Sequence, residues 1–114
     1  MNFTASSAQV VSFLAGCQAI VDANLATLGE LNKIQTDRLL VTEGGRYLKV
    51  VRETMHRPSG TVNSRSAHCF IDRTNGDVLK TASWSAPAKG ARGNMADDKN
   101  GLGRMGCYGA GYNR

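Results

Sequence analysis

The 114-residue chain fits one domain with a modest core, and its 41% hydrophobic and 20% charged residues argue against a disordered or fibrous protein. Its net charge of +5 favours anionic partners, and twelve of the fourteen Lys and Arg residues follow residue 45. Cys17, Cys69 and Cys107 are odd in number and widely spaced, which argues against a disulfide framework or zinc site and favours a reducing compartment.

The first predicted element is a helix from Ser7 to Leu28. Ser6 and Gln9 have the spacing of a capping box, and Gly29 is a typical helix stop. Two stripes lie on nearly opposite faces, one of mostly larger residues (Val10, Leu14, Cys17, Val21, Asn24 and Leu28) and one of small residues (Ser12, Gly16, Ala19, Ala23 and Ala26). Either the small stripe packs on a partner helix in a dimer-based homo-oligomer, or it is a solvent-exposed face.

A connector is expected over residues 31–45, ending at the Gly44–Gly45 turn, and an antiparallel sheet over residues 46–84. The strand signals are the alternating run from Arg46 to Thr54, the run from Ser66 to Asp72, the Asn75–Gly76 hairpin turn and the return run from Asp77 to Trp84. Pro87 is expected to end strand growth.

Residues 85–114 are basic and rich in glycine, but they contain several large apolar anchors. We expect an ordered, irregular segment that lies over the sheet. The predicted fold class is therefore α+β: a single domain over residues 1–114 with an N-terminal helix, a small antiparallel β-sheet and this C-terminal segment. The start MNFTASSAQ has no basic n-region and no apolar run reaches membrane length, so a cytoplasmic protein without a membrane partner is expected.

Catalytic signals are weak. His56 and His68 have no adjacent nucleophile at a convincing spacing, and Asp72 and Asp77 flank a turn whose backbone they can bond. The run Asp97–Gly101 lacks the alternating ligands of a calcium loop and is expected to be a turn. We expect no enzyme activity, no metal and no cofactor.

The stretch WSAPAKGARGN favours binding instead. Glycines let backbone N–H groups converge on an anion, Arg and Lys neutralise it, and an aromatic ring can stack on a base. The candidate site residues are Trp84, Lys89, Arg92 and Asn94, with Arg57 and Arg73 from neighbouring loops. In the alternative interpretation Trp84 caps the edge of the core and the cations are solvated.

One tryptophan among seven aromatic residues favours a discrete nucleotide-derived ligand over a long strand, because strand-binding proteins usually display several aromatics along a basic track. A single-stranded nucleic-acid-binding phage protein is the alternative. A third hypothesis is a virion or interaction protein whose basic tail docks on an acidic partner.

The run FIDRTNGDVLKTASWSAPAKGARGN and the ending GLGRMGCYGAGYNR resemble the phage-encoded anti-Thoeris proteins of the first-described type, over about the C-terminal half. The resemblance implies a non-enzymatic sponge in the host bacterial cytoplasm. Such a protein captures a cyclic ADP-ribose-type or cyclic nucleotide signal between subunits, without cleaving it, and assembles further through N-terminal helices. It also implies that Trp84 stacks on adenine, that Asn94 contacts the ligand as a polar group, and that Arg57 and Arg92 hold phosphates.

Overall fold

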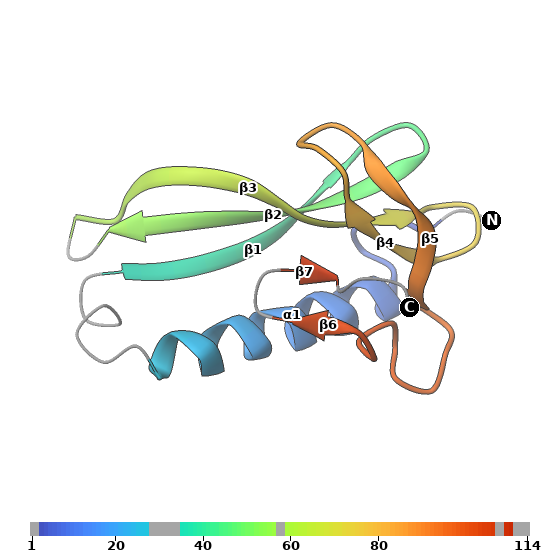
Figure 1. Ribbon diagram of the computed structural model, residues 1–114, viewed down its shortest axis with the longest axis horizontal. Helices are drawn as coiled ribbons and strands as arrows, with labels where there is room; N and C mark the ends of the chain where they lie inside the picture. Colours follow the sequence, from blue (N-terminus) through green and yellow to red (C-terminus); the bar gives the residue numbers. More distant parts are fainter. Residues whose placement is uncertain (1–2, 28–34, 57–58, 107–108, 111–114) are drawn as a thin grey trace.

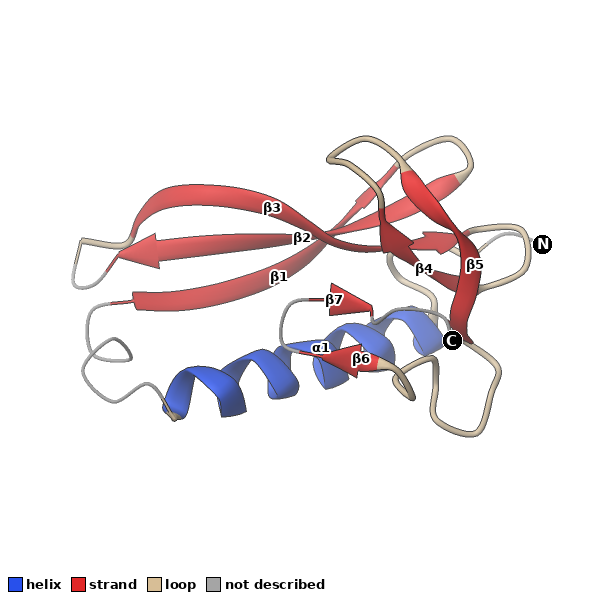
Figure 2. Cartoon of the chain, in the orientation of Figure 1, coloured by secondary structure: helices blue, strands red, loops and turns tan. Residues whose placement is uncertain are grey.

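The computed structural model describes residues 3–27, 35–56, 59–106 and 109–110. The helix α1 (Ala8–Ala26) lies against one face of an antiparallel sheet (Figure 1). The sheet has the order β1 (Gln35–Glu43), β2 (Tyr47–His56), β3 (Thr61–Asp72), β4 (Asp77–Thr81) and β5 (Pro87–Asn94), and a small hairpin of β6 (Met105–Gly106) and β7 (Gly109–Ala110) lies beside the helix (Figure 2). The predicted α+β class is confirmed.

The sheet extends beyond the predicted range at both ends. The expected connector over residues 31–45 contains β1, because TDRLLVTE alternates in the way a half-buried strand does, and residues 28–34 lie outside the described part. Pro87 does not end the sheet but opens β5. It is the first residue of an edge strand, which is a position where the missing N–H of proline is tolerated.

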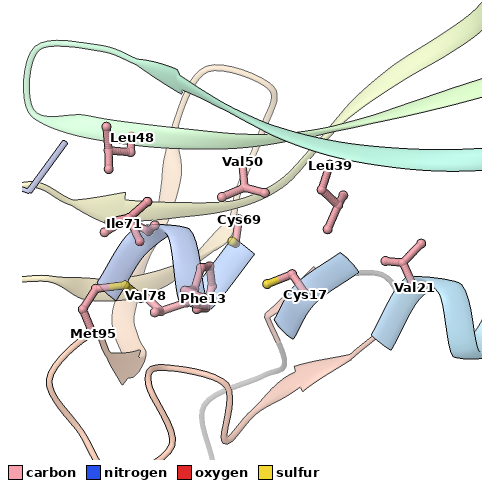
Figure 3. Close-up of a cluster of buried hydrophobic side chains, with 11 residues drawn as sticks. Phe13, Cys17, Val21, Leu39, Leu48, Val50, Cys69, Ile71, Val78 and Met95 are labelled. Atoms are coloured by element: carbon pink, nitrogen blue, oxygen red, sulfur yellow. The ribbon is translucent and has the colours of Figure 1, made fainter. Parts of the chain in front are cut away.

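The core lies between α1 and the sheet. The helix buries Val10, Phe13, Cys17, Val21 and Leu25. Figure 3 shows its side chains meeting those of the sheet, including Leu39, Leu48, Val50, Cys69, Ile71 and Val78. The predicted stripe was right at Val10, Cys17 and Val21, but Phe13 and Leu25 occupy the places expected for Leu14 and Asn24. A helix turns 3.6 residues at a time, so a stripe can follow either neighbour at each turn.

The small-residue face of α1 is partly covered by the protein's own C-terminal segment. A Cβ atom on Gly16 would lie 2.3 Å from Cδ1 of Leu102, so the glycine allows this segment to approach closely. Ser12, Ala19, Ala23 and Ala26 are exposed, and the homo-oligomer therefore stays a prediction. By length and composition α1 could cross a membrane, but a core helix of a soluble protein passes the same test.

The segment after β5 is ordered through the turn predicted at Asp97–Gly101. The Asp97 carboxylate accepts hydrogen bonds from the backbone N–H groups of Gly101, Asn94 and Lys99, which lower its pKa. Met95 is buried in the core. Of the segment expected to be irregular, residues 87–94 form β5 and the described residues after it form loops and the short β6–β7 hairpin, while residues 107–108 and 111–114 lie outside the described part.

Candidate functional site

The face of the sheet that points away from α1, here called the outer face, carries no helix (Figure 1). Successive side chains along a strand point to opposite faces. Because Leu48 and Val50 pack toward α1, Lys49 between them points outward, and its register partner Phe70 does the same. The β1–β2 turn and the β4–β5 loop rise on this side of the sheet (Figure 1).

A first hollow of about 350 Å³ opens between this turn and this loop. Its lining consists of Thr42, Glu43, Gly44, Gly45, Arg46, Tyr47, Lys49, Phe70 and Ser85. The Nζ atom of Lys49 lies 4.0 Å from the centre of the Trp84 ring and 6.0 Å from that of Phe70. Among the described residues Lys49 has no carboxylate partner, so its charge is balanced only by the faces of aromatic rings.

The turn beside Lys49 adds hydrogen-bond donors. The Gly44 N–H donates to the Tyr47 carbonyl at 3.0 Å, whereas the Gly45 N–H forms no hydrogen bond with the described residues. The Arg46 guanidinium lies 5.3 Å from the centre of the Tyr47 ring. Among the lining groups listed above, Glu43 is the one carboxylate, and its Oε2 accepts from the Ala5 N–H at 2.9 Å. The balance of the first hollow is therefore cationic.

A second hollow of about 340 Å³ adjoins the first, and the two share Arg46 and Tyr47. Its other lining residues are Asp72, Asn75, Asp77, Leu79, Pro87, Ala88, Lys89, Gly90 and Ala91. Burial alone would raise the pKa of Asp72, but hydrogen bonds from Thr74 and Arg46 outweigh it and lower the pKa. Asp72 is therefore an occupied, ionised partner of Arg46.

Two of the predicted site residues lie on this surface. Trp84 is in the β4–β5 loop with its side chain 49% exposed, and its ring contacts Lys49 rather than the core. Lys89 is exposed on β5 and lines the second hollow. The structure thus places Lys89 in the second hollow and Trp84 against Lys49, which lines the first, and the two hollows meet at Arg46 and Tyr47.

Three predicted residues have structural contacts instead. Arg92 is buried, and its guanidinium donates to the carbonyls of Lys89 and Gly90 within its own strand. Asn94 donates to the Asn75 carbonyl and to Asp77, both at 2.9 Å, and so joins β5 to the β3–β4 turn. Arg73 donates to the carbonyls of Phe3 at 3.0 Å and Gly44 at 2.5 Å, and so ties the N-terminal segment to the β1–β2 turn. The sixth predicted residue, Arg57, lies outside the described residues.

The sequence analysis did not assign Arg46, Tyr47, Lys49 and Phe70 to the site. The alternation of RYLKVVRET places Tyr47 and Lys49 on one face of a strand, and this signal was available. These residues lie near Trp84 because of the five-strand meander, in which β4 and β5 return toward the β1–β2 turn. Among the described residues no group of three His, Cys, Asp or Glu side chains is placed to hold a metal ion.

The fold and the two hollows define a small α+β protein with an open sheet face lined by cations and aromatic rings. The chain belongs to the family of unknown function DUF7717, whose model matches residues 4–112. No curated protein and no solved structure matches it.

Proposed function

We propose that this protein is a non-enzymatic nucleotide-binding protein that captures a phosphate-bearing signal of the cyclic ADP-ribose or cyclic nucleotide type. The observation that carries the proposal is the Lys49 ammonium, which lies over the Trp84 ring at the first hollow without a carboxylate partner among the described residues. An unpaired cation next to two aromatic rings is a favourable place for an anion attached to a flat ring.

The first hollow suits the phosphate. Lys49 and Arg46 supply positive charge, and the free N–H of Gly45 adds a backbone donor of the kind that lines anion-binding turns. The hydroxyls of Thr42 and Ser85 lie in the same lining. Such a set of donors suits the binding of an anion, which is the basis of capture in this proposal.

Trp84 has a different role in this proposal from the one that the resemblance implied. One face of its ring is occupied by Lys49, so the ring fixes the position of the ammonium group. A cation held in place in this way loses less side-chain entropy when a phosphate binds. The phosphate is accordingly placed by Lys49 and Trp84 together, with Arg46 at the boundary between the two hollows.

Isothermal titration with cyclic ADP-ribose isomers and cyclic dinucleotides tests the proposal. Binding is expected for at least one of these ligands, with the ligand recovered intact by chromatography. Lys49→Met should weaken it tenfold or more, while Lys99→Met, a change of the same kind at an exposed lysine away from both hollows, should not. Equal affinities in the two variants, ligand cleavage, or no heat with any ligand would refute it.

A second candidate function, binding of single-stranded nucleic acid, is favoured by one separate observation. Arg38 and Arg65 both bond the Glu53 carboxylate at 2.6 Å on the outer face, and this triad keeps a net positive charge. It lies about 13 Å along β2 from Lys49, a distance that a single strand can span. Oligonucleotide binding that weakens steeply with salt and is lost in Arg38→Ala would support this candidate. Salt-insensitive binding would count against it.

A further inference from the structure

In the second hollow, one of the two oxygens of the Asp77 carboxylate accepts a hydrogen bond from the described residues, and the other does not. Oδ1 of Asp77 accepts from the Asn94 side-chain amide at 2.9 Å, and the Asp77 N–H donates to the Asn75 side chain at 2.8 Å. The other carboxylate oxygen has no hydrogen bond with the described residues. Asp77 is therefore held in one orientation and presents a free acceptor at the second hollow.

The other carboxylate in this hollow is already occupied. Oδ1 of Asp72 accepts from the N–H and the hydroxyl of Thr74, at 2.9 and 2.6 Å, and Oδ2 accepts from Arg46 at 3.3 Å. Asp77 therefore offers the carboxylate oxygen in the second hollow that has no hydrogen bond with the described residues. The rest of the lining is mainly polar, and it also contains the Tyr47 ring and a few apolar residues: Arg46, Asn75, Lys89 and Gly90 lie beside Leu79, Pro87, Ala88 and Ala91.

We propose that the second hollow binds the nucleoside part of a ribonucleotide, with Asp77 accepting hydrogen bonds from the hydroxyl groups of the ribose. The inference rests on the proposed function, because it assumes that the phosphate lies at Lys49 in the first hollow. The hollows share Arg46 and Tyr47, so a single ligand can reach both. The Tyr47 ring lies where the hollows meet and can pack on a base, and a carboxylate is a typical partner of ribose hydroxyls in nucleotide sites.

The charge of Asp77 explains why the free acceptor selects a sugar and not a second phosphate. A carboxylate accepts hydrogen bonds from hydroxyl groups but repels a phosphate at the same place. Lys89 lies in the same lining and partly balances this charge. Removal of one hydroxyl from the ligand leaves the Asp77 oxygen desolvated without a partner, which should weaken binding about tenfold or more.

Calorimetric titration with three probes separates this inference from the proposed function: adenosine 5′-monophosphate, its 2′-deoxy counterpart and inorganic pyrophosphate. The protein should bind the ribonucleotide about tenfold more tightly than the deoxyribonucleotide. Asp77→Asn should abolish that preference and leave pyrophosphate binding equal or stronger. Asp98→Asn, at an exposed aspartate outside both hollows, should retain the preference.

The outcomes are distinguishable. If pyrophosphate and both nucleotides bind through Lys49 with equal nucleotide affinities, or if Asp77→Asn retains the ribose preference, this inference is overturned and the proposed function stands. If none of the probes and none of the cyclic signals binds, both fall together. The comparison of the two nucleotides uses the unaltered protein, so it does not depend on the folding of a variant.

Discussion

The two faces of the sheet contain the same kind of contact in different surroundings. On the helix side Arg52 pairs with Asp37, and their side chains are only 16% and 0% exposed. On the outer face Arg38 and Arg65 pair with Glu53, and the arginine side chains are 56% and 59% exposed. Arg52 and Glu53 are adjacent in β2, so a single step along the strand separates a buried pair from a triad whose two arginines are exposed around a buried carboxylate. Burial, and not the pairing itself, decides what each contact does for the protein.

The helix side also joins a polar side chain of the helix to the sheet. The Gln18 side chain on α1 donates to the Asp37 carbonyl and accepts from the Leu39 N–H, both at 2.8 Å. It thus bonds backbone groups of β1, which is an edge strand of the sheet. The outer face instead leaves the Lys49 charge and one oxygen of Asp77 unused among the described residues. This difference indicates that the helix side serves stability and that the outer face is available for a ligand.

The largest loss of stability is expected for a substitution in the core between α1 and the sheet. Phe13 is fully buried in the core, and its truncation removes an aromatic ring and leaves a cavity. Phe13→Ala should lower the free energy of unfolding by about 4 kcal/mol. Val11→Ala, at a side chain that is 54% exposed on the same helix, should change it little. Urea denaturation measures both, and similar losses in the two variants would contradict the assigned buried face of α1.

The two arginine contacts provide the next comparison. Asp37→Ala leaves the largely buried guanidinium of Arg52 without its carboxylate and should cost about 3 kcal/mol of stability. Arg38→Ala, on the outer face of the same strand pair, should cost much less because this arginine is exposed and Arg65 still bonds the Glu53 carboxylate. Equal losses of unfolding free energy in the two variants, measured by urea denaturation, would contradict the role of burial in this difference.

His68 provides a pH-dependent test of the same distinction. It is the extra residue of a β-bulge in β3, 2% exposed, and neither ring nitrogen has a hydrogen-bond partner among the described residues. Burial, with a further contribution from the Arg52 guanidinium, lowers its pKa from 6.5 to about 4. The unfolded chain therefore binds a proton between these values more readily than the folded chain, and stability falls as the pH falls through this window.

The free energy of unfolding should consequently drop by about 2 kcal/mol between pH 7 and pH 4.5. The pKa values of Glu53, Asp72 and Asp97 are lowered, so the stabilisation from these groups is lost mainly at lower pH. His68→Leu removes the titrating ring and should flatten the dependence in this window. Thermal unfolding across the pH range is the measurement, and an unchanged slope in the variant would assign the loss to other groups.

Short sequence patterns predicted part of the fold, namely the helix α1 and the turn between β3 and β4. The helix and the Asn75–Gly76 turn each rest on a few consecutive residues, and these predictions agree with the fold. The capping box at Ser6 and Gln9 was wrong, because the helix is capped at Ser7 without a side-chain capping hydrogen bond, and Gly29 lies outside the described residues.

The strand β1 was missed although TDRLLVTE alternates, and β5 was missed because Pro87 was taken as a stop, whereas it opens an edge strand that pairs with β4. For the site, short patterns were not sufficient, since Trp84 was selected correctly as a surface aromatic while its neighbour Lys49 is thirty-five residues earlier in the chain.

The smallest loss of stability is expected for a substitution of Trp84. If the contact of Trp84 with Lys49 had no role in binding, its removal would change neither stability nor ligand affinity by much. Trp84→Ala should reduce the free energy of unfolding by only about 1 kcal/mol, because an exposed cation–π contact contributes little. It should nevertheless weaken nucleotide binding about as much as Lys49→Met, since the ammonium then loses its fixed position. Parallel urea denaturation and calorimetric titration separate the two readouts. A large loss of stability with unchanged binding would place Trp84 with the helix side of the comparison instead.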